Sequence, residues 1–117
     1  MRAIVINAQN RTITETEIDG SLESLQQIVG GLIEPFSHGL DDDHHCYVNE
    51  EGLLHHPQHF FMFRDGHQPV AGNGVILSET DDGDEAPCTL PLDWVKERVT
   101  FMDLPAVRQW CRTHEGA

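Results

Sequence analysis

Residues that can bind metals are concentrated in one part of the chain. Seven of its eight histidines lie between residues 38 and 67, and a cysteine lies among them. Imidazole and thiolate are the usual ligands of zinc and similar transition metals. The regular ligand pairs of structural zinc sites are missing, and Pro57 interrupts the best-spaced histidines. We expect either a solvated histidine-rich surface or a site for zinc or another transition metal, for which the candidate ligands are His44, Cys46, His55, His56 and His59.

Carboxylates are the second concentrated group. The net charge is −13, while four of the seven basic residues follow residue 95. This charge repels nucleic-acid backbones, so direct nucleic-acid binding is not expected. Clustered carboxylates either keep a protein soluble or contact a basic partner protein, whose DNA-binding site they can occupy by imitating phosphates. The candidate binding surface consists of Asn49, Glu50, Glu51, Asp41, Asp42, Asp43, Asp81 and Asp82.

Catalytic motifs are absent from the sequence. There is no G-x-S-x-G, no H-E-x-x-H and no Walker loop. Cys46 follows two histidines, but adjacent strand residues point to opposite faces, so a buried thiol is expected rather than a nucleophile with its base. We therefore assign no catalytic residues and favour a non-enzymatic protein.

Local patterns predict the elements that position these residues. Segments 2–8 and 11–18 form a β-hairpin signal, and Ser21 is suited to cap a helix that Gly30 and Gly31 end. Apolar segments around 32–33, 46–48, 60–63 and 75–77 predict four further strands. A short helix over 91–97, a strand over 99–101 and a helix capped by Asp103 follow. The fold class is α+β: a mixed or mainly antiparallel sheet that starts with a β-hairpin, with two or three helices packed on one side.

Chain length and composition indicate the overall organisation. The 117 residues suit a single domain, with a core over 1–102 and a C-terminal helix and tail over 103–117. Trp94 and Trp110 are expected to anchor the C-terminal helices in the core. The apolar runs are too short to span a membrane, and the first residues resemble a strand rather than a signal peptide, so a cytoplasmic location is expected. The three cysteines are expected to be reduced thiols.

Four segments together resemble a known family: 1–8, 30–35, Asn49-Glu50-Glu51-Gly52-Leu53 and Gly72-Asn73-Gly74-Val75-Ile76. The sequence is similar over about residues 1–102 to a domain-of-unknown-function family of small proteins encoded largely by phages, plasmids and their bacterial hosts. The resemblance implies a mobile-element setting and supplies no catalytic residues. The run from Asn49 to Leu53 is either a binding surface or a turn that fixes the backbone.

Three functional hypotheses follow. The leading one is a non-enzymatic, acidic accessory protein that contacts another, unidentified protein, such as a host defence or DNA-processing factor. The second is a metal-binding protein that uses the histidine-rich segment 38–67. The third is a small hydrolase or nucleotide-binding enzyme, because fold and function are loosely tied. A homodimer is a further expectation, through a free sheet edge or through Phe60–Phe63 if that segment is not core.

Overall fold

The computed structural model describes residues 1–36, 39–66 and 68–114. The elements, in chain order, are β1 (Arg2–Asn7), β2 (Thr12–Glu17), α1 (Leu22–Val29), β3 (Ile33–Phe36), β4 (His44–Asn49), the 3-10 helix η1 (Gly52–His55), β5 (His59–Phe63), β6 (Val70–Ala71), β7 (Gly74–Glu79), β8 (Glu85–Ala86), α2 (Leu92–Arg98), β9 (Val99–Asp103) and α3 (Leu104–His114). The predicted α+β class is confirmed. The two-residue strands β6 and β8 and the 3-10 helix η1 were not predicted, because such short segments show no periodicity.

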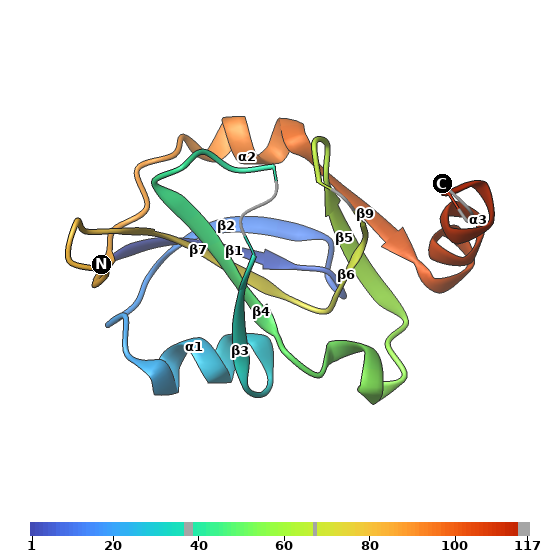
Figure 1. Cartoon of the computed structure of the whole chain (residues 1–117), viewed down its shortest axis with the longest axis horizontal. Coiled ribbons are helices and arrows are strands. Elements are labelled where there is room, and N and C mark those ends of the chain that lie inside the picture. Colours follow the sequence, from blue (N-terminus) through green and yellow to red (C-terminus); the bar gives the residue numbers. More distant parts are fainter. Residues whose placement is uncertain (37–38, 67, 115–117) are drawn as a thin grey trace.

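The strands form two antiparallel sheets (Figure 1). Sheet A has the order β2-β1-β7-β4-β3, and β8 pairs with β7. Sheet B has the order β6-β5-β9. The predicted hairpin is the β1–β2 pair, in which Ile6 lies opposite Ile13. The prediction of a mainly antiparallel sheet that starts with a hairpin is therefore confirmed.

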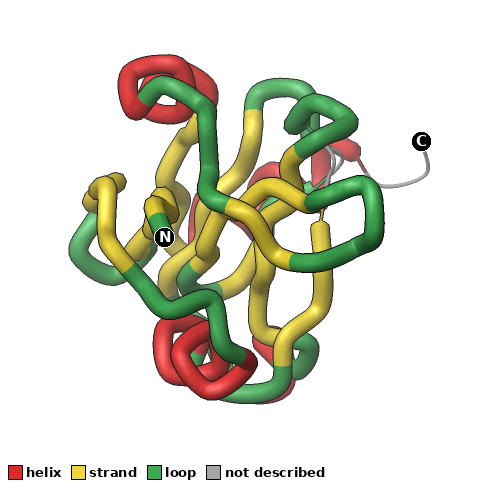
Figure 2. The backbone as a smooth tube through the Cα atoms, turned by 90° about the vertical axis from the view of Figure 1, so that its left-hand side faces the viewer, coloured by secondary structure: helices red, strands yellow, loops and turns green. Residues whose placement is uncertain are grey.

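Helices cover both faces of sheet A, as Figure 2 shows, and not one side as expected. Alternate residues of β7 point in opposite directions. Val75 and Leu77 pack with Leu25 of α1, whereas Ile76 packs with Val95 of α2 and with residues of sheet B. A central strand that is apolar on both faces must be covered on each side. The order of the elements along the sequence does not specify which helix covers which face.

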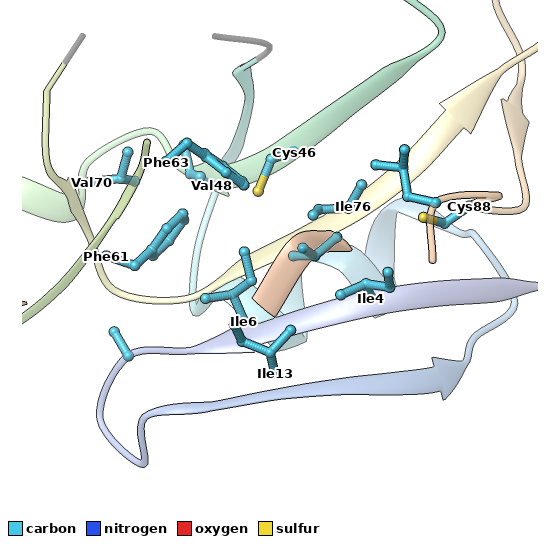
Figure 3. Packing of buried hydrophobic residues seen from close by; sticks show 13 residues of the cluster. Ile4, Ile6, Ile13, Cys46, Val48, Phe61, Phe63, Val70, Ile76 and Cys88 are labelled. Carbon is cyan, nitrogen blue, oxygen red and sulfur yellow. The ribbon is translucent and has the colours of Figure 1, made fainter. Parts of the chain in front are cut away.

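The main core lies between sheets A and B (Figure 3). Phe61 and Phe63 of β5 are buried and meet edge to face, with 5.8 Å between ring centroids. Gly74 lets the sheets approach, because an added Cβ would lie 2.6 Å from Cys46 Sγ and 2.9 Å from Phe61 Cζ. Segment 60–63 is thus core, and its apolar rings are not free for the self-association considered above.

The ends of α1 form as predicted. Ser21 Oγ accepts a hydrogen bond from Ser24 N–H at 3.2 Å. Gly30 has φ of 84°, in the left-handed region, and its N–H donates to Gln26 O at 2.8 Å. A residue with a Cβ is disfavoured in this conformation, so the glycine determines where the helix ends.

The C-terminal elements divide into a packed part and an exposed part. In α2, Val95 is fully buried, and Trp94 packs against the core with the Arg98 guanidinium 4.0 Å from its ring centroid. Asp103 caps α3 as predicted, because its Oδ1 accepts from Ala106 N–H at 2.9 Å. The prediction that Trp110 anchors the core is wrong: α3 has no buried residue and lies at the end of the molecule beyond β9 (Figure 1). No described helix is long and apolar enough to cross a membrane.

Candidate functional site

Successive side chains of strand β4 point to opposite faces of the sheet, and this separates the predicted site residues. His44, Cys46 and Val48 are buried, and the last two lie in the core between the sheets. His45, Tyr47 and Asn49 point to the opposite face and are half-buried. Neighbours in the sequence therefore belong to different environments.

The predicted metal ligands are not brought together. Cys46 is fully buried, and burial raises the pKa of its thiol to about 12. His55 at the end of η1, His56 directly after it and His59 at the start of β5 are exposed. Among the described residues, no group of three or more His, Cys, Asp or Glu is arranged to hold a metal. Both ends of the histidine-rich segment, His38 and His67, lie outside the described residues, and the metal site stays a prediction.

His44 connects three segments through its imidazole. Its Nδ1 lies 2.7 Å from Asp41 Oδ1. Its Nε2 accepts from Thr89 N–H at 3.1 Å and lies 3.2 Å from Thr89 Oγ1. The order acid, imidazole, hydroxyl is that of a hydrolase triad. However, the backbone N–H occupies the Nε2 lone pair that a general base needs, and this geometry places the ring proton on Nδ1. The arrangement fastens the Asp41 loop and Thr89 to β4.

His45 and Tyr47 form a second polar cluster with two carboxylates. His45 Nδ1 lies 3.6 Å from Glu79 Oε2, and its Nε2 lies 3.4 Å from Glu85 Oε2. The Tyr47 hydroxyl donates to Glu85. Burial, followed by this hydrogen bond and the two negative charges, raises the pKa of Tyr47. The sequence does not reveal this cluster, because the β7–β8 hairpin brings Glu79 and Glu85 to β4 and no motif marks that pairing.

The acidic candidates form two separate groups. The loop with Asp41–Asp43 adjoins the β7–β8 hairpin, since Asp43 O accepts from Glu79 N–H at 3.2 Å. Asp81 and Asp82 are exposed in the turn of that hairpin. The segment Asn49–Glu51 begins at the last residue of β4, at the opposite end of the strand and roughly 17 Å away for a strand of this length. The eight candidates therefore do not make one continuous surface.

Asn49 has a structural role at the end of α1. Its Nδ2 donates to Val29 O at 3.3 Å, and its Oδ1 accepts from Glu51 N–H at 2.8 Å. Asn73 acts in parallel: its Nδ2 donates to Ile28 O at 3.3 Å. The last carbonyls of a helix lack partners within the helix, and these two amides supply them. For Asn49, the structural interpretation of the Asn49–Leu53 run is thus supported.

Glu50 and Glu51 lie at the mouth of an open pocket of about 320 Å³. Both carboxylates are exposed, and neither makes a hydrogen bond or ion pair within the described ranges. Glu34 of the edge strand β3 adds a third carboxylate. The lining residues of this acidic pocket are Glu34, Phe36, Val48, Asn49, Glu50, Glu51, Gly52, Leu53, Leu54, Gln68, Pro69, Val70 and Ala71. An apolar floor with an acidic rim suits a cationic side chain with an aliphatic stem, such as Lys or Arg.

The sequence was compared with protein families, curated proteins and solved structures. Curated proteins and solved structures give no match. One family model, Domain of unknown function (DUF3846), matches residues 1–110 and so covers nearly the whole chain, including β9 and the first turns of α3. The prediction that the sequence resembles a domain-of-unknown-function family is confirmed. The chain belongs to the DUF3846 family.

Proposed function

We propose that this chain is a non-enzymatic accessory protein that acts by binding another protein at the acidic pocket. The observation that carries the proposal is the pocket itself: Glu34, Glu50 and Glu51 border an apolar floor that includes Val70 and Ala71. Other candidate residues, His44, His45 and Asn49, form bonds within the chain and so have structural roles. The pocket carboxylates have no such partner and lie next to apolar surface, so folding alone does not explain them. Such a surface favours a partner segment that carries Lys or Arg.

The acidic charge of the pocket and the family resemblance together suggest a class of partner protein. Proteins that bind DNA use Lys and Arg to neutralise phosphates, so their binding sites complement an acidic surface. The resemblance to phage- and plasmid-encoded proteins adds a mobile-element setting. We therefore propose a host defence or DNA-processing factor as the partner.

The test compares two variants that remove the same number of charges. Affinity capture from a bacterial host lysate identifies the proteins bound by the wild-type chain, and binding of each purified protein is then measured directly. Glu34→Gln/Glu50→Gln/Glu51→Gln alters the pocket. The matched control, Asp81→Asn/Asp82→Asn/Asp84→Asn, alters the exposed β7–β8 turn.

Binding at the pocket and general charge attraction give different kinetics. Loss of long-range attraction slows association in both variants, whereas loss of direct contacts speeds dissociation. We expect at least about tenfold weaker binding, chiefly through faster dissociation, for the pocket variant only. Equal losses in the two variants, or no loss in the pocket variant, would contradict the proposal.

A further inference from the structure

An exposed apolar groove lies beside the acidic pocket, on the other side of η1. Leu53 and Leu54 are each 73% exposed, more than Leu22 at 58% or Leu32 at 54%. Leu53 lines both the acidic pocket and a second hollow of about 390 Å³, whose opposite wall is Leu104 and Val107 of α3. The groove is lined by Leu53, His56, Pro57, Gln58, Phe60, Leu104, Val107 and Arg108. We call this the η1–α3 groove.

The apolar face of helix α3 is not buried against the rest of the protein, although its sequence pattern predicts that it should be. Leu104, Val107 and Trp110 share one face, yet the helix has no buried residue and its main contacts are with β9 and β5. The Trp110 ring stacks on His114 of the same helix, with 4.1 Å between centroids. An 11-residue helix is marginal in water unless its apolar face is packed. Packing of its apolar face against another surface would therefore stabilise the helix.

Opposite charges flank the η1–α3 groove. Glu50 and Glu51 precede η1 on one side of the leucines. Arg108 lines the groove on the α3 side, and Arg112 follows one turn later on the same stripe of the helix. Neither guanidinium forms an ion pair within residues 1–36, 39–66 and 68–114. Across the surface the order is acidic, apolar, basic.

We propose that a second copy of this chain covers the η1–α3 groove in a two-fold symmetric dimer. A two-fold axis places the same patch against itself in reverse order, which brings acidic residues against basic ones and apolar against apolar. Arg108 and Arg112 of one copy then face Glu50 and Glu51 of the other, with Leu53 and Leu54 at the centre. This inference does not depend on the proposed function.

The first test measures the mass of the purified full chain by sedimentation over a range of concentrations. We expect a concentration-dependent dimer for the wild type. Leu53→Asp/Leu54→Asp should weaken it at least about tenfold, because charge at the centre of an interface is strongly unfavourable. The matched control is Leu22→Asp on α1, which replaces another leucine that is 58% exposed and should leave the dimer unchanged. Circular dichroism confirms that each variant is folded.

A charge exchange tests the orientation. Arg108→Glu/Arg112→Glu should dissociate the dimer, and adding Glu50→Arg/Glu51→Arg to the same chain should restore it, because the opposite charges meet again. A wild type that stays monomeric, an unaffected leucine variant, or a folded four-residue variant without restored association would overturn the proposal. Since host proteins are absent from these measurements, their failure is distinguishable from failure of the proposed function.

Discussion

Several side chains that are suited to chemistry hold this protein together instead. His44 joins Asp41 to Thr89, and His45 lies between two carboxylates. Each of these contacts satisfies a polar group that would otherwise be costly to leave unpaired beside the core. Glu50 and Glu51 differ, because both are exposed and line the open pocket. Residue identity alone does not separate the two kinds of role.

Tyr47 should ionise well above the usual pH of a phenol, about 10. Burial and the bond to Glu85 raise its pKa. The neutral phenol therefore contributes stability that is fully present below about pH 10 and is lost as pH rises through the folded-state pKa. Tyr47 is the chain's single tyrosine, so tyrosinate absorbance reports it alone.

The Tyr47 titration has a direct control. Glu85→Gln removes a negative charge next to the hydroxyl and should lower the midpoint, while burial keeps it above that of the unfolded chain. Glu50→Gln removes an equal charge at the other end of β4 and should leave the midpoint unchanged. A wild-type midpoint equal to that of the denatured protein would refute the assignment.

The three thiols should differ in reactivity. Cys46 is fully buried with a pKa of about 12, burial also raises the pKa of Cys88, and Cys111 is exposed. Because the thiolate is the reactive form, a disulfide reagent at mildly alkaline pH should modify only Cys111 in the folded protein. The other two should react only after unfolding in denaturant. Cys111→Ser should abolish the fast reaction. If a second thiol reacted rapidly in the folded protein, Cys46 or Cys88 would be accessible to the reagent, contrary to their burial.

At the scale of elements, β4 is the organising strand. It pairs with β3 on one side and β7 on the other, and its alternation sends Cys46 and Val48 into the core. On the other face Asn49 reaches the end of α1, as does Asn73, which precedes β7. Two asparagines thus fix one helix end to two neighbouring strands.

Asn49→Ala should destabilise the protein by about 1 to 2 kcal/mol, because it removes the bonds to Val29 O and from Glu51 N–H. Urea unfolding followed by circular dichroism measures the loss. Asn10→Ala, in the exposed turn between β1 and β2, is the matched control and should change stability by no more than about 0.5 kcal/mol. Equal effects of the two substitutions would mean that the helix end does not depend on Asn49.

At the scale of the whole molecule, two sheets share one core and the charge is uneven. Sheet A carries α1 on one face and sheet B with α2 on the other. The acidic groups lie at both ends of β4, whereas Arg108 and Arg112 lie on α3. Glu50 and Glu51 belong both to the acidic pocket and to the proposed dimer surface, so a foreign partner and a second copy would compete for these two carboxylates.

Gly74→Ala should destabilise the packing of the two sheets by about 1 to 3 kcal/mol, because the new Cβ overlaps Cys46 and Phe61. Phe61→Leu removes part of the ring that the Cβ would meet. In a double-mutant cycle of unfolding free energies, the pair should therefore cost less than the sum of the single changes. Strict additivity would show that the glycine and the ring are not in contact.

The sequence by itself determined the features that depend on near neighbours. Short sequence patterns predicted the β1–β2 hairpin, the Ser21 cap, the Gly30 stop and the Asp103 cap. The caps and the stop involve bonds within a few residues, and the hairpin joins two adjacent segments through a short turn. The acidic character and the family membership were likewise predictable from composition and motifs.

Only the tertiary structure decided which distant residues meet. The cluster of His45, Tyr47 and Glu85 and the link from His44 to Thr89 depend on strand pairing and on loops that return across the sheet. The position of Trp110 outside the core could not be read from helical periodicity, because an apolar stripe shows that a helix face needs cover but not what supplies it. The acidic pocket arises in the same way, where Glu34 of one strand comes beside the turn that follows another.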